Sequence, residues 1–388
     1  MIAELKTTSR ENWRTVRFGD VVRNVDSSVK NPLEQGIERF VGLEHLDPES
    51  LHVKRWGNVA DGTSFTRKFE SGQVLFGKRR AYQRKAAVAD FDGICSGDIL
   101  VFEPKTDELL PELLPFVVQS DGFFEHALGT SAGSLSPRTK WSDMARYEFV
   151  LPPKDEQRRI AEILWSVDKV ISSYEKCISE TMIFQKLFME SRISVESSFE
   201  QWKTVSLNEV CFVQSGQVNP KIEPYSNMIH IAPDDIESQT GRILEKKTAS
   251  EDKVISGKYE FKAGVILYNK IRPNLQKVAM PDFNGICSAD VYPVYAKESI
   301  ISKLLFYILL SDEFTKYATA NSVRSAIPKL NREALMKYSF KLPSMDKQEK
   351  IVEALDAIAF SLNEIEKHKA QSQNLKNDLI RKLLFKTQ

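Results

Sequence analysis

The stretch FESGQVLFGKRRAYQRKAAVADFDGICSGD, from Phe69 to Asp98, recurs in diverged form later in this chain. The second copy, FKAGVILYNKIRPNLQKVAMPDFNGICSAD, runs from Phe261 to Asp290 without a gap, 192 residues later. This period exceeds the roughly 20 to 50 residues of solenoid repeats, so it indicates two globular domains rather than an array.

The repetition extends over nearly the whole chain. The segment WRTV at 13–16 matches WKTV at 202–205. Further along, the displacement falls to 191 residues, and LPPKDEQRRIAEIL from Leu151 matches LPSMDKQEKIVEAL from Leu342. Each copy therefore combines a mixed segment with a long helical segment.

The composition is that of an ordinary globular protein. Of 388 residues, 42% are hydrophobic and 28% are charged, which is enough to build substantial cores. The net charge is only +1, so any contact with DNA must use local charge. The first residues lack a signal-peptide pattern, and the sequence contains no run of about 18 consecutive apolar residues, the length that a membrane-spanning helix needs. We expect a cytoplasmic protein without membrane contact.

Cysteine and histidine are scattered along the chain. The four cysteines show no Cys-x-x-Cys spacing and the five histidines do not cluster, so neither a zinc site nor a disulfide framework is expected. Cys95 and Cys287 occupy equivalent GIC contexts, which favour a small buried residue.

The mixed segments read as short strands followed by a helix. Apolar runs at 74–76, 99–102 and 265–268 are bounded by turn residues, which is typical of strands. Apolar spacing predicts helices over 112–127 and 301–318. The expected class is therefore α+β.

A proline ends each mixed segment, and a long helix should follow. Apolar side chains then recur at alternating steps of three and four, which is typical of a coiled-coil seam. The predicted seam consists of Ile160, Ile163, Val167, Val170 and Tyr174 in the first helix and Ile351, Leu355, Ile358, Leu362 and Ile365 in the second. Two antiparallel helices would bury this stripe; an ordinary surface helix on its own domain is the alternative.

These patterns predict four segments with pseudo-two-fold internal symmetry. Two similar mixed α/β domains should be joined by two long antiparallel coiled-coil helices. The expected limits are a first domain at 1–152, a first helix at 153–198, a second domain at 199–343 and a second helix at 344–388.

A dense basic segment follows the strand at 74–76 and has a counterpart in the second copy. Lys and Arg can neutralise phosphates, while Arg, Asn and Gln can pair with base edges in the major groove. A solvated turn is the alternative, but retention in both copies favours function. The candidates are Lys78, Arg79, Arg80, Tyr82, Arg84 and Lys85 in the first copy and Lys270, Arg272, Asn274, Gln276 and Lys277 in the second.

A polar loop further along each copy is the second candidate for DNA binding. Small hydroxyl and basic side chains can approach phosphates closely, although a plain loop fits equally well. The candidates are Ser134, Arg138, Lys140, Ser322, Arg324 and Lys329.

Signatures of catalysis are weak. Gly129–Gly133 spells the hydrolase elbow G-x-S-x-G around Ser131, but it should follow a helix rather than a strand, and the second copy has Ala320 and Arg324 in place of the glycines. Phosphate-loop, dinucleotide and His-Glu-x-x-His motifs do not occur. We therefore expect no catalytic residues and no metal site.

Taken in order, these motifs resemble the specificity (S) subunits of type I restriction-modification systems. The resemblance rests on the Trp-x-Thr-Val entry, a basic segment like LYNKIRPNLQKVA, the GICS-(Gly/Ala)-Asp turn and an exit like LPP-x-x-x-Gln-x-x-Ile into a helix, which recur in the same order in the two copies. The first copy departs from the common pattern, because Arg79 and Ala81 replace the Ile and Pro seen at Ile271 and Pro273.

The resemblance implies two target-recognition domains, each reading one half of a split, asymmetric site in double-stranded DNA. It also implies helical spacers that set the distance between half-sites and dock two modification (methyltransferase) subunits, which two restriction subunits would join. S-adenosylmethionine, ATP and Mg²⁺ are then expected only on the partner subunits. By this resemblance Lys78, Arg80, Lys270 and Arg272 lie in the family's basic segment.

Two other functions remain open from the residues alone. The chain could be a coiled-coil interaction protein without DNA readout, or a stand-alone hydrolase built on Ser131.

Overall fold

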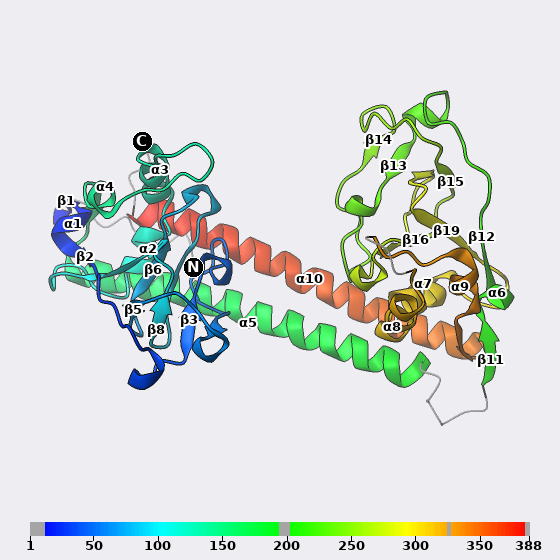
Figure 1. The fold of residues 1–388 in the computed structure, drawn as a ribbon, viewed down its shortest axis with the longest axis horizontal. Helices are drawn as coiled ribbons and strands as arrows, with labels where there is room; N and C mark the ends of the chain where they lie inside the picture. The colour runs from blue at the N-terminus through cyan, green and yellow to red at the C-terminus, as the bar shows by residue number, and fades with distance from the viewer. Residues whose placement is uncertain (1–11, 194–201, 324–326, 385–388) are drawn as a thin grey trace. The chain divides into compact units, whose positions relative to one another are not determined.

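The chain forms two compact units, each containing one copy of the repeat. The computed structural model describes residues 12–193, 202–323 and 327–384. The first unit comprises Met1–Glu175 with Glu366–Gln388, and the second comprises Lys176–Ile365. Both boundaries fall inside long helices, α5 (Lys154–Ile193) and α10 (Met345–Leu384), so each helix contributes to both units (Figure 1).

Two four-stranded sheets form the globular part of the first unit. Their strand orders are β2-β9-β6-β7 and β4-β3-β8-β5. Neighbouring strands are antiparallel except β3 and β8, which are parallel. The strands are β2 (Val22–Asn24), β3 (Arg39–Val41), β4 (Gly57–Asn58), β5 (Arg67–Phe69), β6 (Val74–Gly77), β7 (Ala86–Val88), β8 (Gly93–Cys95) and β9 (Ile99–Pro104).

The second unit repeats this topology. Its sheets have the orders β12-β19-β16-β17 and β14-β13-β18-β15, and β13 and β18 are again the parallel pair. The strands are β12 (Cys211–Val213), β13 (Ile229–Ile231), β14 (Lys247–Thr248), β15 (Tyr259–Phe261), β16 (Ile266–Asn269), β17 (Val278–Ala279), β18 (Gly285–Cys287) and β19 (Val291–Ala296). The expected α+β class and internal repeat are confirmed.

A two-stranded ribbon joins the entry and the exit of each globular part. In the first unit β1 (Arg14–Arg17) is antiparallel to β10 (Glu148–Leu151). In the second unit β11 (Lys203–Ser206) pairs in the same way with β20 (Ser339–Leu342). Short helices accompany the ribbons, namely α1 (Phe18–Val21) and α4 (Trp141–Met144) in the first unit and α6 (Leu207–Val210) and α9 (Arg332–Lys337) in the second.

The single helices predicted over 112–127 and 301–318 are each broken in two. The first is α2 (Leu114–Val118) followed by α3 (Asp121–Gly129), and the second is α7 (Ser302–Leu310) followed by α8 (Asp312–Ala320). The break occurs because Ser120 and Ser311 adopt extended backbone and their hydroxyls accept hydrogen bonds from the backbone N–H three residues later. These serines are N-caps, which start a new helix despite the continuous apolar periodicity.

Close packing explains why the GIC sequence begins with glycine in both copies. A Cβ atom at Gly93 would lie 2.5 Å from the ring of Phe69, and one at Gly285 would lie 2.6 Å from the carbonyl oxygen of Ile229. Only glycine fits at either position without a shift of its neighbours.

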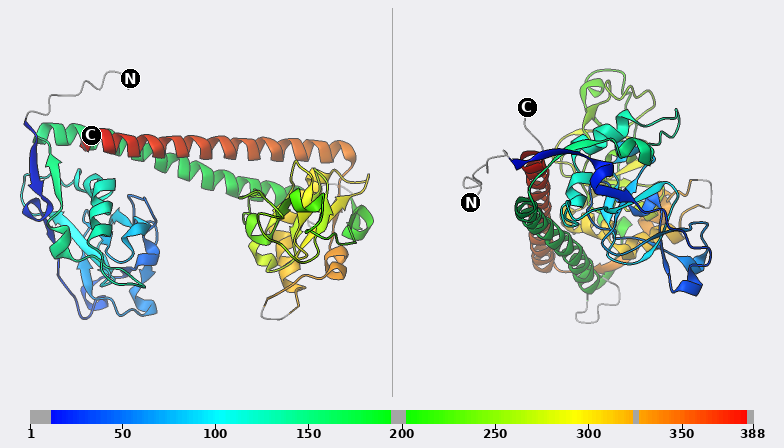
Figure 2. Two further views of the ribbon diagram at one scale, coloured as in Figure 1. Left: turned by 90° about the horizontal axis from the view of Figure 1, so that it is seen from above. Right: turned by 90° about the vertical axis from the view of Figure 1, so that its left-hand side faces the viewer.

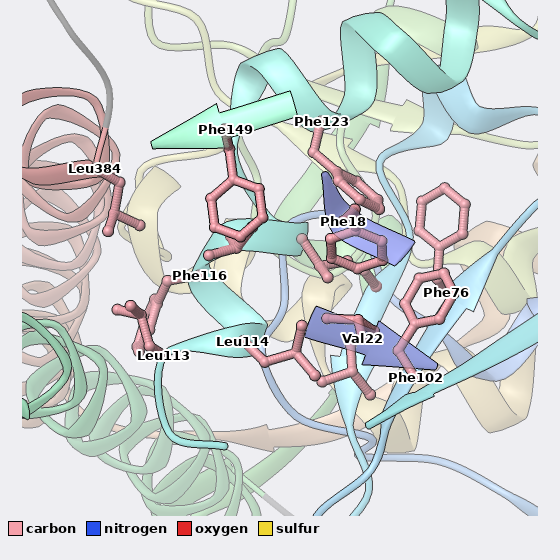
Figure 3. Packing of buried hydrophobic residues seen from close by; sticks show 14 of the residues in the cluster. Phe18, Val22, Phe76, Phe102, Leu113, Leu114, Phe116, Phe123, Phe149 and Leu384 are labelled. Carbon is pink, nitrogen blue, oxygen red and sulfur yellow. The ribbon is translucent and has the colours of Figure 1, made fainter. Parts of the chain in front are cut away.

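Aromatic side chains dominate the main core of the first unit. Phe18, Phe76, Phe102 and Phe123 are fully buried, and Phe18 contacts Phe102 and Phe123 with ring centroids 5.3 and 4.9 Å apart (Figure 3). Leu384, near the end of α10, belongs to the same cluster. A segment from the end of the chain therefore completes the core of the unit that contains its beginning.

Within the first unit the two long helices are antiparallel. Asp168 and Glu175 on α5 form ion pairs with Lys376 and Lys369 on α10, so residue numbers rise along one helix as they fall along the other. Figure 2 shows the last part of α10 (red) beside the first part of α5 (green). In the second unit Met189 of α5 shares a buried cluster with Ile351 and Leu355 of α10.

The structure places the predicted seam positions at different depths. Ile160, Ile351 and Leu355 are buried, and the other predicted positions apart from Val170 are half-buried. Val170 is 46% exposed, and Ile171 is buried in its place. The buried stripe passes through Ile160, Leu164, Asp168 and Ile171, because a helix of 3.6 residues per turn drifts away from a strict seven-residue repeat.

Candidate nucleic-acid interface

In the first unit the basic segment forms a tight turn directly after a buried strand. Strand β6 ends at Gly77, and a short 3-10 turn, η6 (Ala81–Gln83), follows. Arg80 and Arg84, on either side of η6, have φ angles of 55° and 51°. Non-glycine residues adopt this left-handed conformation infrequently, and such backbone strain clusters at functional sites.

The second unit builds the same turn from different residues. Its 3-10 turn, η9 (Pro273–Leu275), lies between Arg272 and Gln276, whose φ angles are 47° and 49°. The replacement of Ile271 and Pro273 by Arg79 and Ala81 in the first copy therefore leaves the backbone conformation unchanged. The two turns differ in the side chains that they present.

The structure brings the two sequence candidates of the first unit together. Arg79 forms a β-bridge with Arg138 of the polar loop, and Arg80 N–H donates to the Pro137 carbonyl at 2.8 Å. Arg79 Nε also donates to the Ser136 hydroxyl at 2.7 Å. The basic turn and the polar loop therefore form one surface.

The second unit has the same junction. Ile271 bridges to Lys329, and Arg272 N–H donates to the Pro328 carbonyl at 2.8 Å. Leu330 N–H donates to the Lys270 carbonyl at 2.9 Å, as Thr139 N–H does to Lys78 in the first unit at 3.0 Å. Arg324 lies outside the described residues.

An acidic residue lies beneath each junction and was absent from the predicted site. The Asp98 carboxylate accepts hydrogen bonds from Arg138 Nε at 2.8 Å and from Arg79 Nη1 at 3.5 Å. Asp290 occupies the equivalent position, 3.4 Å from Lys329 Nζ and 3.6 Å from Lys270 Nζ. Both residues end the repeated GICS-(Gly/Ala)-Asp sequence, and this repetition is the sequence feature that could have identified them as part of the site.

Several predicted residues lie at the exposed surface of the junctions. Tyr82 at the tip of the first turn is 56% exposed. The other candidates with exposed side chains are Ser134, Arg138, Lys140, Arg272, Asn274 and Lys329, while Arg79, Arg80 and Ser322 are half-buried. These residues could reach a bound phosphate or base.

Other basic candidates are engaged within the protein. Lys85 Nζ donates to the Leu43 carbonyl, and Lys277 Nζ donates to the Pro233 carbonyl, each at 2.7 Å. Lys270 Nζ donates to the Ala289 carbonyl at 2.7 Å. Burial, as the largest influence, lowers the pKa of Lys78. Retention of these lysines in both copies thus has a structural reason, and their contact with DNA stays a prediction.

The residue that follows each 3-10 turn contacts an acid at the start of a helix. Arg84 Nη2 lies 2.9 Å from Asp121 Oδ1, and Gln276 Nε2 donates to Asp312 Oδ1 at 2.7 Å. The Arg84 guanidinium also lies over the Phe124 ring, 4.7 Å from its centroid. These contacts direct both side chains toward the protein.

Ser131 lacks the setting of a hydrolase nucleophile. It follows helix α3 rather than a strand, and its hydroxyl donates to the Ala127 carbonyl at 2.7 Å. A nucleophile elbow requires a strand-to-helix turn that exposes the serine. The local geometry therefore argues against the hydrolase alternative.

Among the described residues, one group could offer ligands to a metal ion: His230, Asp235 and Asp252. His230 Nδ1 lies 2.7 Å from Asp252 Oδ2, and Asp235 accepts a hydrogen bond from Ala232 N–H at 2.7 Å. These hydrogen bonds use His230 Nδ1 and one oxygen each of Asp252 and Asp235, while the buried His230 Nε2 has no hydrogen-bond partner within the described residues. No helix in the described ranges is both long and apolar enough to cross a membrane.

Comparison with known proteins places this architecture in one family. The model of the type I restriction modification DNA specificity domain matches twice, at residues 10–181 and 199–374. The chain is 29% identical to the type I restriction enzyme EcoDI specificity subunit of Escherichia coli. The match covers 66% of this chain and 64% of that protein, which is less than two thirds of the relative's length. It is 23% identical to the type I restriction enzyme MjaVIII specificity subunit of Methanocaldococcus jannaschii, over 96% of this chain and 92% of that one.

The fold has a counterpart among solved structures. The crystal structure of a type I restriction-modification system S subunit from M. genitalium superimposes with a TM-score of 0.58 at 12% identity, and the match covers 99% of both chains. The duplicated topology and the paired basic turns agree with the two family matches, because each match covers one copy of the repeat. This chain belongs to the type I restriction modification DNA specificity domain family, and it carries two such domains.

Proposed function

We propose that this chain is the DNA-specificity subunit of a type I restriction-modification complex and reads a bipartite, asymmetric DNA sequence. The observation that carries the proposal is the junction of basic turn and polar loop, built twice on the same backbone with different exposed side chains. Tyr82 stands at the tip of one turn and Asn274 at the tip of the other. One scaffold with two sets of side chains suits two different half-sites.

The distribution of charge supports this assignment. The net charge of the whole chain is +1, yet each junction gathers arginine and lysine side chains around one small surface. Local basic groups supply phosphate contacts, while arginine and asparagine can read base edges. Near-neutral total charge and DNA recognition are therefore compatible.

In this proposal the chain is not itself a catalyst. Modification and restriction subunits would supply the chemistry, together with S-adenosylmethionine, ATP and Mg²⁺. The long helices α5 and α10 would carry the modification subunits. Several apolar side chains of α5 are exposed and available for such contacts, namely Met182, Ile183, Phe184 and Leu187.

A strand-resolved methylation map tests the proposed function. The chain would be produced with its modification subunits, and genomic DNA modified by the complex would be sequenced for methylated bases. We expect one bipartite motif with two different halves separated by unread base pairs. Methylation without such a motif would contradict the proposal.

The interaction-protein alternative makes a different prediction for the same complex. If the chain does not contact DNA, changing Arg272 to Gln should leave the salt dependence of DNA binding unchanged. Loss of a phosphate contact should instead reduce the slope of log K against log salt by about 0.9.

A further inference from the structure

The position of Asp98 is unexpected for a surface that should attract phosphates. Its side chain is 21% exposed and lies among three basic residues, Lys78, Arg79 and Arg138. A carboxylate at this point weakens the attraction of the surface for any nucleic acid, irrespective of sequence. Its presence therefore calls for a compensating role.

The second unit retains the acid although two of its three basic neighbours differ. Asp290 faces Lys329 and Lys270, whereas Asp98 faces Arg138 and Arg79. Position 271 of the second unit is isoleucine where the first unit has Arg79. The retained feature is thus a carboxylate beside basic side chains, rather than one particular ion pair.

The backbone of the turn does not depend on the carboxylate. The Asp98 carbonyl accepts a hydrogen bond from Lys78 N–H at 3.0 Å, and its N–H donates to the Ser96 hydroxyl at 3.2 Å. Asp290 repeats these contacts with Lys270 at 3.0 Å and Ser288 at 3.3 Å. An asparagine at either position could keep both backbone contacts, so the function of the charge can be tested separately from the turn.

The carboxylate fixes the direction of its basic neighbours. Arg138 donates to the two oxygens of Asp98 through Nε at 2.8 Å and Nη2 at 3.4 Å, which holds the plane of the guanidinium. The hydrogen bond from Arg138 outweighs burial and keeps the pKa of Asp98 below its usual value, so the group is charged at neutral pH. A guanidinium held in one plane can form paired hydrogen bonds only with a base edge that lies in a matching orientation. A guanidinium that is free to rotate can also pair with phosphates, whatever the sequence.

We propose that Asp98 and Asp290 are positioning residues for sequence readout. Each carboxylate orients the basic side chains of its own junction, and it also weakens the attraction of that junction for DNA of unrelated sequence. This inference rests on the proposed function. The ligand of each junction is one half-site of duplex DNA. Asp98 acts on the half read by the first domain and Asp290 on the half read by the second.

The test compares Asp98→Asn and Asp290→Asn in the assembled complex with its modification subunits. Dissociation constants would be measured for the mapped site, for sites with substitutions in one half, and for unrelated duplex DNA. Asp98→Asn should reduce discrimination at one half-site about tenfold or more and leave the other half-site unaffected, and Asp290→Asn should do the reverse. Binding to unrelated DNA should stay equal or become tighter.

Two controls separate positioning from folding and from charge. Asp107→Asn changes the net charge equally at a side chain of the first unit that is 89% exposed, and it should leave discrimination unchanged. Arg138→Gln should lower discrimination at the same half-site as Asp98→Asn, and the double variant should lose little more than either alone. Additive losses would contradict a shared role.

The outcomes distinguish the inference from the function on which it rests. If the wild-type complex shows no preference for a bipartite site, the proposed function fails. If the wild-type complex discriminates and Asp98→Asn discriminates equally well, the inference alone is overturned. Equal loss at both half-sites, with a lower melting temperature, would also overturn it, because that pattern indicates a structural defect.

Discussion

Lys376 Nζ lies 3.1 Å from Asp168 Oδ1, and this ion pair is buried, with side chains 2% and 5% exposed. It joins the two long helices within the first unit, and His52 adds a contact to the other oxygen of Asp168 at 2.6 Å. Removing one partner of a buried pair leaves an uncompensated charge.

The first prediction concerns this pair. Lys376→Met should destabilise the first unit by about 3 to 5 kcal/mol, measured by urea unfolding. Lys176→Met, which removes an exposed ammonium from a weak pair with Glu180, should change the stability by less than about 1 kcal/mol. The double variant Asp168→Asn with Lys376→Met should be more stable than Lys376→Met alone, and a less stable double variant would contradict the pairing.

The second prediction is a loss of stability in acid. Burial alone would raise the pKa of Asp168, but the hydrogen bond from His52 and the charge of Lys376 outweigh it and hold that pKa below its usual value. The stabilisation is therefore complete above the unfolded-state pKa of about 4 and is lost as the pH falls through the lower native pKa. Urea midpoints measured between pH 7 and pH 3 should fall more steeply for wild type than for Asp168→Asn; parallel curves would refute this assignment.

The third prediction concerns a glutamine at the start of each long helix. Gln157 Nε2 donates to the carbonyls of Pro152 and Glu108, both at 2.8 Å, and its Oε1 accepts from Leu110 N–H at 2.9 Å. Gln348 makes the equivalent contacts in the second unit. Replacement by leucine leaves buried backbone groups unpaired, each costing about 1 to 3 kcal/mol.

Hydrogen exchange can localise this effect. Gln157→Leu should accelerate exchange at the Leu110 amide, and Gln348→Leu at the Ile301 amide. Gln371→Leu, at an exposed position on α10, serves as the control and should change neither. Unaltered protection of Leu110 in Gln157→Leu would show that the hydrogen bond contributes little.

The fourth prediction separates exposed from anchored basic residues. Arg272→Gln, at an exposed position, should weaken DNA binding by the assembled complex and reduce its salt slope by about 0.9. Lys277→Met, at a side chain 14% exposed that donates to Pro233, should instead lower the melting temperature of the second unit. A salt slope reduced equally by both changes would place Lys277 on the DNA.

The fifth prediction concerns thiol reactivity. Cys177 is exposed, whereas burial raises the pKa of Cys95 and Cys211 to about 12 and raises that of Cys287 still further. Since the thiolate is the reactive form, iodoacetamide near pH 7.5 should label Cys177 in the native protein. Mass spectrometry of peptides should show the other three labelled only after unfolding, and rapid native labelling of Cys95 would disagree with its burial.

The duplication made much of the architecture predictable from sequence. Two copies of one pattern indicate two similar domains. A heptad pattern indicates packed helices, and this inference does not require knowledge of the other side-chain contacts in the core. The position of each basic turn after a strand was also predictable, because Val74 and its apolar neighbours are bounded by turn residues. These features depend on the long repeat and on local patterns of apolar and turn residues.

The errors involve one local cap and several contacts between distant residues. Ser120 splits a predicted helix through a cap that apolar spacing does not reveal. Asp98 bonds to Arg138, 40 residues away, and Lys85 donates to Leu43, 42 residues away. Neither pairing follows from local patterns. The sequence therefore identified the basic residues, but it did not separate those that bond within the protein from those that are exposed.

The burial of Leu379, Ile380 and Leu384 in the main core of the first unit has a consequence for synthesis. The strands of the first unit end at Leu151, so they are synthesised more than 200 residues before Leu379, Ile380 and Leu384. At roughly 5 to 20 residues per second, translation needs on the order of ten seconds or more to supply them. Part of this core stays uncovered during that time, so the domain made first is the one finished last.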